Sequence, residues 1–341
     1  MNLSYEKEMD TEIIPKELKN AKLLVTGASG LIGSVLTEYL LKENAQYQMG
    51  VKLILLVRNR EDLLSKLGNR IGKENIQIIQ GDICCLPEIT DDIDYIIHGA
   101  SITASSMMIE HPVQVIKTNL KGTANILEFA KKKSVKGVVY LSTMEVYGFT
   151  EEEKLLTEEQ VQYLNPLELR SSYPESKRMC ENLCVSYASE FHIPVKIIRL
   201  AQTFGRGVKA DDTRVFAQFA RCVRDGKDIE IMTDGRSKRM YLDTEDAVRA
   251  ILTVLLKGKT GEVYNAANKE TYCSIREMAE MVASEISEGK IKVYVGVGEE
   301  NVKKFPPAHK LMLDVSKLEE LGWRPETGLR EMYLEMIEGW Q

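Results

Sequence analysis

The sequence predicts an α/β fold in which a doubly wound, mostly parallel sheet is followed by a smaller C-terminal α/β unit. Three observations lead to this expectation. Apolar runs of strand length alternate with segments of helical pattern from residue 21 to about residue 200, which indicates βαβ units. A loop with three regularly spaced glycines follows the first apolar run. After about residue 203 the alternation becomes irregular, and a chain of 341 residues leaves room for a second unit.

The expected elements follow one another in a regular order along the chain. Residues 1–20 read as a short polar extension that ends in a turn near Pro15. Strands are expected at 22–26, 52–57, 76–79, 94–98, 137–142, 195–200 and near 229–232. Helices are expected at 31–43, 60–67, 113–132, 173–191, 213–225, 244–257, 274–287 and 328–339. The first unit is expected to comprise residues 21–201 with about 236–266, and the second about 202–235 and 267–341.

The composition is that of an ordinary globular protein with a mildly acidic surface. The formal net charge of −6 argues against a nucleic acid as the main partner. No apolar run approaches the roughly 20 residues that cross a bilayer, and the charged N-terminus is unlike a signal peptide. The six cysteines include no C-x-x-C pair, and the four histidines share no metal-ligand spacing. We therefore expect a cytoplasmic protein with reduced thiols and no metal site.

The glycine loop predicts a site for a phosphate group. Gly27, Gly30 and Gly33 stand three residues apart between the expected strand at 22–26 and a helical segment. Glycines allow a sharp turn and a close approach of a pyrophosphate to main-chain N–H groups, and the start of a helix favours an anion. Alone, the motif is also compatible with a simple tight connection, so the chemistry must come from residues downstream.

Two further segments supply residues suited to proton transfer. Tyr173 and Lys177 lie four residues apart at the start of an expected helix and therefore share one face. Thr143 lies at the end of an expected strand and can bond to the same substrate oxygen. A neighbouring ammonium and a positive nicotinamide would favour the tyrosine phenolate, which could then accept a hydroxyl proton during hydride transfer. A lone Y-x-x-x-K is usually a surface pair, but here the glycine loop accompanies it.

With these motifs the chain resembles the extended short-chain dehydrogenase/reductase family of nucleotide-sugar epimerases, dehydratases and decarboxylases. The resemblance runs from about Ala21 to the C-terminus. Besides the residues above, it includes Gly81-Asp82, His98-Gly99-Ala100, Asn119 to Thr123, and the closing segments Leu321 to Pro325 and Gly328-Leu329.

The resemblance implies a Rossmann-type sheet, a bound NAD(P) and a C-terminal nucleotide-sugar unit. It also implies a homodimer through helices such as 113–132 and 173–191. Thr143, Tyr173 and Lys177 match the family's catalytic triad, and Asp82 matches its adenine contact. By the same match, the cofactor would also contact Gly27, Ser29, Gly30, Leu31, Ile32, Gly33, Ile83, Ala100, Ser101 and Asn119.

Within the family, the chain looks most like the UDP-glucuronate decarboxylases. Glu145 stands where decarboxylases and 4,6-dehydratases carry a glutamate. The dehydratases also have an acid at the preceding position, which here is Met144 and cannot donate a proton. The segments 165–178, 212–216 and 234–239 are similar to the decarboxylase pattern. Arg239 matches an active-site arginine, whose guanidinium could bind a carboxylate or phosphate, although a surface salt bridge is the alternative interpretation.

Three positions leave the substrate and the form of the cofactor open. Gln202 and Arg206 replace the asparagine and proline that the family usually has against the nucleotide diphosphate, where Arg214 is also expected. Arg58 follows the strand at 52–57, at a position where members that bind NAD have an acidic residue for the ribose 2′-hydroxyl. An arginine there suits a 2′-phosphate and favours NADP(H), although tightly bound NAD stays possible.

The leading hypothesis is an enzyme that oxidises a nucleotide sugar at C4, with decarboxylation of a UDP-glucuronate-like substrate as the specific reaction. A nucleotide-sugar 4-epimerase and an NADPH-dependent keto-sugar reductase are the alternatives within the family. Arg58 favours the reductase, whereas Glu145 and Arg239 favour the decarboxylase. A hypothesis from another class is a non-catalytic dinucleotide-binding regulator.

Overall fold

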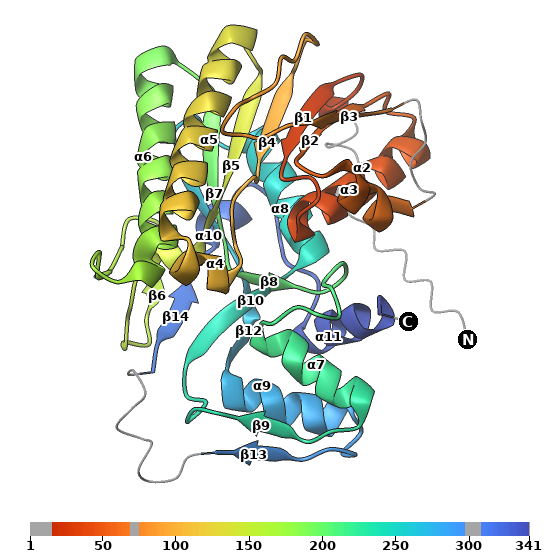
Figure 1. Ribbon diagram of the computed structural model, residues 1–341, viewed down its shortest axis with the longest axis vertical. Helices are drawn as coiled ribbons and strands as arrows, with labels where there is room; N and C mark the ends of the chain where they lie inside the picture. The colour runs from red at the N-terminus through yellow and green to blue at the C-terminus, as the bar shows by residue number, and fades with distance from the viewer. Residues whose placement is uncertain (1–15, 69–74, 297–307, 341) are drawn as a thin grey trace.

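A seven-stranded parallel sheet forms the centre of the larger unit (Figure 1). The computed structural model describes residues 16–68, 75–296 and 308–340. The strand order is β11-β7-β5-β4-β1-β2-β3, which is the Rossmann-type arrangement and confirms the predicted fold class. The strands are β1 (Lys22–Thr26), β2 (Lys52–Val57), β3 (Ile76–Gln80), β4 (Tyr95–His98), β5 (Gly137–Thr143), β7 (Val195–Leu200) and β11 (Val263–Ala266).

Helices cover both faces of this sheet, which explains why its strands are nearly continuous apolar runs. One face carries α2 (Leu31–Tyr47), α3 (Arg60–Leu67) and α8 (Thr244–Lys257), which pack onto residues such as Leu23 and Leu55. The other face carries α5 (Pro112–Lys133) and α6 (Ser172–Phe191), with short α4 (Ser105–Glu110) at their end (Figure 1). The helices predicted at 60–67 and 244–257 are confirmed, and those at 113–132 and 173–191 extend by one residue at one or both ends.

A smaller unit lies below the carboxyl ends of the sheet strands (Figure 1). Its sheet has the order β12-β10-β14-β6, with β8 beside β10, and β9 pairs with β13. The strands are β6 (Leu155–Leu156), β8 (Gln202–Phe204), β9 (Ile229–Ile231), β10 (Lys238–Asp243), β12 (Asn268–Ser274), β13 (Val293–Val295) and β14 (Lys310–Leu313). The helices are α7 (Val215–Asp225), α9 (Ile275–Met281) with a π-helical turn at Val282–Ile286, α10 (Ser316–Glu319) and α11 (Leu329–Glu338). Phe204 stacks on Phe216 at its core.

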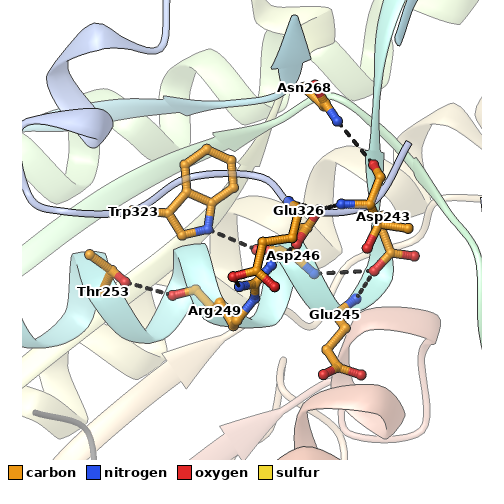
Figure 2. Close-up of polar contacts among 9 residues, drawn as sticks. Asp243, Glu245, Asp246, Arg249, Thr253, Asn268, Trp323 and Glu326 are labelled. Atoms are coloured by element: carbon orange, nitrogen blue, oxygen red, sulfur yellow. Dashed lines mark hydrogen bonds and ion pairs between the residues drawn. The ribbon is translucent and has the colours of Figure 1, made fainter. Parts of the chain in front are cut away.

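A buried polar cluster fastens the C-terminal segment to α8 (Figure 2). Asp246 is fully buried on the first turn of α8, and its carboxylate accepts the main-chain N–H groups of Glu326 and Thr327, each at 3.0 Å. Arg249 forms ion pairs with Asp246 and with Glu326. The indole of Trp323 donates to the carbonyl of Asp246 at 3.1 Å. We call Asp246, Arg249 and Glu326 the anchor cluster, because it fixes the chain that leads into α11.

Several expectations about the whole chain can be compared with the described residues. None of the described helices is long and apolar enough to cross a membrane. Within the described ranges, no group of three His, Cys, Asp or Glu side chains is arranged to hold a metal. All six cysteines are free thiols, and the expected cytoplasmic location stays a prediction. Of the predicted extension 1–20, residues 1–15 lie outside the described part of the chain.

Candidate active site

The carboxyl ends of the parallel strands open into one cavity of about 930 Å³. Residues that follow β1, β2, β3, β4, β5 and β7 line it, and Arg239 and His309 reach it from the smaller unit. In the Rossmann-type arrangement, ligands bind at this edge, where the strand order reverses between β1 and β4. The cavity therefore lies where the glycine loop and the tyrosine–lysine pair were expected to meet.

The glycine loop turns tightly between β1 and α2 and leaves main-chain donors free for an anion. Gly27 has a φ of +74°, and a Cβ there would lie 2.8 Å from the main chain of Gly99 and Ala100. A Cβ on Gly33 would lie 2.3 Å from the carbonyl oxygen of Gly27. Gly30 caps α2 without any side-chain acceptor, and the first turn has no acidic residue. The N-terminus of this 17-residue helix thus fits a phosphate in both shape and charge.

Most of the residues predicted to contact the cofactor line this cavity. They are Gly27, Ser29, Gly30, Leu31, Ile32, Gly33, Arg58, Asp82, Ile83, Ala100, Ser101, Tyr173 and Lys177. Arg58 is exposed at the end of β2, so its guanidinium can reach a ligand there. Asn119 does not line the cavity: it lies buried behind the wall, where it accepts from Ser101 Oγ and donates to Ser176 Oγ, both at 2.8 Å. Its contacts are those of a residue that positions Ser101.

Thr143, Tyr173 and Lys177 come together although they lie on two elements. Thr143 ends β5 and caps the 3-10 helix Met144–Tyr147. Tyr173 and Lys177 are one turn apart at the start of α6, and both are buried. The Lys177 ammonium donates to the carbonyl of Leu141 at 2.7 Å and lies 5.8 Å from the centre of the Tyr173 ring. The carbonyl contact holds the lysine against the end of β5.

The protein by itself does not make Tyr173 acidic. Burial raises the pKa of Tyr173, and the charge of Glu145 adds to the rise, while contacts with Thr143, Arg170 and Ser101 oppose it. Burial lowers the pKa of Lys177 to about 8. The phenolate is therefore favoured only when further positive charge enters the cavity.

The substrate end of the cavity carries several charged groups. Glu145 pairs with Arg170 at 2.9 Å, and both side chains are about one-third exposed. Arg239 is the second residue of β10, and its buried Nε has no hydrogen-bond partner among the described residues. Arg214 lines the cavity but is held by Asp212 at 2.6 Å. We call Glu145, Arg170 and Arg239 the cavity cluster.

The remaining predicted substrate contacts divide into two groups. Gln202 lines the cavity at the start of β8, as Arg214 and Arg239 do. Arg206 does not line it: its guanidinium is about half exposed and pairs with Glu38 of α2 at 3.2 Å. The prediction that Arg206 lies against the substrate thus has no support in this geometry, because its guanidinium pairs with Glu38 outside the cavity lining.

Arg170 and His309 line the cavity but were not singled out from the sequence. Arg170 stands three residues before Tyr173, and its place in that motif is the signal that could have pointed to it. His309 lies far along the chain, and the histidines were set aside because none showed metal-ligand spacing. Only the pairing of β14 with β10 and β6 brings His309 to the cavity, and this pairing has no local signature.

The cavity and the fold together define an NAD(P)-dependent enzyme. The sequence model of the "NAD dependent epimerase/dehydratase family" matches residues 23–267. The chain therefore belongs to this family, which is the extended short-chain dehydrogenase/reductase family that its motifs resemble. The glycine cradle, into which no Cβ would fit at Gly27 or Gly33, suits the dinucleotide.

Relatives with three different activities are similar to this chain over most of its length. UDP-glucuronic acid decarboxylase 3 of Arabidopsis thaliana is 29% identical over 317 residues, which cover 92% of this chain and 86% of that protein. Human dTDP-D-glucose 4,6-dehydratase is 27% identical over 331 residues, covering 93% and 88%. The solved structure of UDP-glucuronic acid 4-epimerase from Bacillus cereus in complex with NAD has a TM-score of 0.75 at 25% identity, covering 93% of this chain and 98% of that one.

Proposed function

We propose that the protein oxidises a nucleotide sugar at C4 and that the sugar carries an acidic group, as in UDP-glucuronate, which is then lost as CO₂. The observation that carries this proposal is the charge at the substrate end of the cavity. The buried Nε of Arg239 lacks a partner among the described residues, and Glu145 and Arg170 line the same space. A guanidinium with an open donor suits a carboxylate or phosphate. The similarity to UDP-glucuronic acid decarboxylases supports the same substrate class.

In this proposal the triad residues act on the C4 hydroxyl. A dinucleotide held by the glycine loop would supply a reversible hydride acceptor for C4. Tyr173 takes the hydroxyl proton, and Thr143 holds the same oxygen by a hydrogen bond. Lys177, fixed by its bond to the carbonyl of Leu141, supplies positive charge beside the phenol. This lysine, together with the positive charge that an oxidised nicotinamide would bring, would offset the burial that raises the pKa of Tyr173.

The residues around the acidic group favour decarboxylation over dehydration. Once C4 is a ketone, the bond from C5 to the carboxylate can break, because its electron pair moves into the C4 carbonyl as CO₂ leaves. Glu145 and Arg239 assist this step, and protonation of C5 follows. A 4,6-dehydration needs an acid for the C6 hydroxyl, and Met144 at the matching position is buried and has no proton to give.

Arg58 supports the alternative of an NADPH-dependent keto-sugar reductase. It lines the cavity at the end of β2, where a 2′-phosphate would lie, and no acidic residue occupies that strand end. We propose that NADP(H) binds better than NAD(H). The variant Arg58→Asp should reverse this preference, and fluorescence titration with both cofactors measures it. An unchanged ratio of the two affinities would contradict the assignment.

One experiment separates the proposed reactions. The purified protein is incubated with NAD, NADP or NADPH and a panel of nucleotide sugars, and the products are weighed by mass spectrometry. Loss of the mass of CO₂ from UDP-glucuronate supports the decarboxylase. An isomer of unchanged mass indicates the 4-epimerase, and a gain of two hydrogens that requires NADPH indicates the reductase. Tyr173→Phe should bind the cofactor normally and lose turnover. No turnover by the wild type on any nucleotide sugar would favour the non-catalytic regulator.

We also propose a homodimer through α5 and α6, which lie side by side on one face of the larger unit (Figure 1). Large apolar side chains are exposed on these helices: Val113 and Ile116 on α5, and Met179 and Val185 on α6. A second copy that packs its own pair of helices here would bury them. Analytical ultracentrifugation of Val113→Glu/Met179→Glu should show monomers. Leu334→Glu, an exposed position on α11, is the matched control.

We further propose that the two units bind different ligands. The larger unit, 21–201 with much of 236–266, would bind the cofactor, and 202–235 with 267–341 would bind the nucleotide sugar. Strands β6 and β10 are exceptions within the first set, because β6 pairs with β14, and β10 pairs with β8, β12 and β14 of the smaller sheet. Because Arg239 lies on β10, the smaller sheet contributes this residue to the cavity.

A further inference from the structure

His309 is built into the wall of the cavity, close to Arg239. Its main-chain N–H donates to Ser237 Oγ at 3.2 Å, and its carbonyl accepts the N–H of Lys238 at 2.8 Å. Its ring stacks on Phe149, with the ring centres 5.3 Å apart and the planes 23° apart. The start of β10 therefore holds the main chain of His309 and Phe149 holds its ring, which lines the same cavity as Arg239.

The contacts of the ring decide which nitrogen carries the proton. Nδ1 lies 3.2 Å from both the N–H and the carbonyl oxygen of Thr150. That carbonyl already accepts the N–H of Lys310 at 2.8 Å. The arrangement in which Nδ1 accepts from the Thr150 N–H gives both main-chain groups a partner, and it places the ring proton on Nε2. Burial and the charge of Arg239 lower the pKa of His309, so the ring is neutral near pH 7.

With Nδ1 turned to the main chain of Thr150, the Nε2–H on the other side of the ring has no hydrogen-bond partner among the described residues. His309 lines the same cavity as Arg239, so this N–H is a donor available there. Arg239 contributes an Nε–H whose acceptor is not among the described residues. Two of the other arginines that line the cavity, Arg170 and Arg214, are paired with carboxylates. The cationic donor of Arg239 and the neutral donor of His309 therefore line the same cavity, and no carboxylate among the described residues is paired with either N–H.

We propose that His309 binds substrate directly, donating from Nε2 to an anionic oxygen that Arg239 also holds. This inference rests on the proposed function, because it requires a nucleotide sugar in the cavity. The oxygen belongs either to the diphosphate or to the carboxylate of the sugar. Both present an oxyanion that takes charge-assisted hydrogen bonds from such donors. His309 is thus a specificity-determining residue of the substrate site.

Calorimetric titration of the protein with its cofactor bound tests the inference. The ligands are UDP, UDP-glucose and UDP-glucuronate, with dTDP and dTDP-glucose in parallel. His309→Phe keeps a ring to stack on Phe149 but has no donor, and we expect it to weaken binding about tenfold or more. His309→Gln keeps a donor and should recover most of the affinity. His111→Phe, an exposed histidine outside this cavity, is the matched control.

The pattern across ligands identifies the oxygen. A loss of affinity for every ligand points to the diphosphate, and a loss confined to UDP-glucuronate points to the sugar carboxylate. Wild-type affinity of His309→Phe for all the ligands, with an unchanged melting temperature, would overturn the inference and leave the proposed function standing. Failure of the wild type to bind any of the ligands would overturn the proposed function and this inference with it.

Discussion

The anchor cluster and the cavity cluster are both built from arginines and carboxylates, yet they differ in how many of their polar atoms have partners within the described chain. In the anchor cluster, Asp246 is fully buried, and main-chain N–H groups and Arg249 occupy its oxygens (Figure 2). In the cavity cluster, Glu145 and Arg170 are about one-third exposed, and Arg239 keeps a buried donor without a described partner.

The difference separates a structural role from a binding role. A buried charge is tolerated when its partners are complete, because an unpaired one costs several kcal/mol. The anchor cluster meets this condition within the chain and fastens the C-terminal segment to α8. The cavity cluster leaves donors for a molecule that the chain does not supply. Substitutions in the first should therefore lower stability, and substitutions in the second should lower binding.

The largest effect is expected from breaking the anchor cluster. Arg249→Met removes the cation that pairs with Asp246 and Glu326 and leaves a buried carboxylate without its charge partner. The free energy of unfolding should fall by about 3–5 kcal/mol, which urea titration followed by circular dichroism can measure. Arg324→Met, which alters an exposed arginine of the same segment, is the control. A loss below about 1 kcal/mol would show that the pair is not needed to hold the segment.

Breaking the cavity cluster should have the opposite signature. Arg239→Met should lower kcat/KM by about 10²-fold or more, because a charged donor to the substrate is lost. Its stability should stay within about 1 kcal/mol of the wild type, since Nε has no described partner to lose. Steady-state kinetics and urea titration together test this. Arg236→Met is the control, because Arg236 is mostly exposed, pairs with Asp234 and lies outside the cavity lining. A large loss of stability in Arg239→Met would show that Arg239 has a structural role, as the anchor cluster does.

Asp243 borders the anchor cluster, and its carboxyl group should make the stability of the protein depend on pH. It caps α8, but its buried Oδ2 has no described partner, and burial raises its pKa to about 6. In the unfolded chain this pKa is about 3.9. Between these values the folded state binds more protons, so stability falls as pH rises from about 4 to 6, and the penalty is complete above that.

Asp243→Asn keeps a capping oxygen and removes this penalty. The variant should therefore gain stability relative to the wild type as pH rises from about 4 to 7, by at most about 3 kcal/mol. Urea titrations at several pH values measure the difference. A gain that does not change with pH would show that Asp243 is already charged in the folded protein at low pH.

The smallest effect is expected at the exposed pair of the cavity cluster. Arg170→Gln removes the partner of Glu145, but water can solvate both side chains, so stability should change by less than about 1 kcal/mol. The charge of Glu145 then acts on Tyr173 without the opposing charge of Arg170, which raises the pKa of Tyr173 further. The alkaline shift of the kcat/KM profile with pH measures this effect. An unshifted profile would show that Arg170 does not act on Tyr173.

The features predicted best were those that depend on neighbouring residues in the chain. Strands that are buried on both faces, such as β1 and β2, show as apolar runs, and Gly27 and Gly33 mark a turn that tolerates no Cβ. The spacing of Tyr173 and Lys177 follows from the helical turn alone. For these elements the local pattern contains the structural information, and the predicted bounds agree with the structure.

What the sequence by itself determined is the class of fold, the dinucleotide loop and the tyrosine–lysine pair, since each is written in residues a few positions apart. Only the tertiary structure decided which charged residues pair with each other and which residues line the cavity. It paired Arg206 with Glu38, placed Asn119 behind the cavity wall, and brought His309 beside Arg239 through the pairing of β14 with β10. The physical reason is that pairing between distant strands depends on the packing of the whole chain, so a site that spans two units is complete only when both have folded.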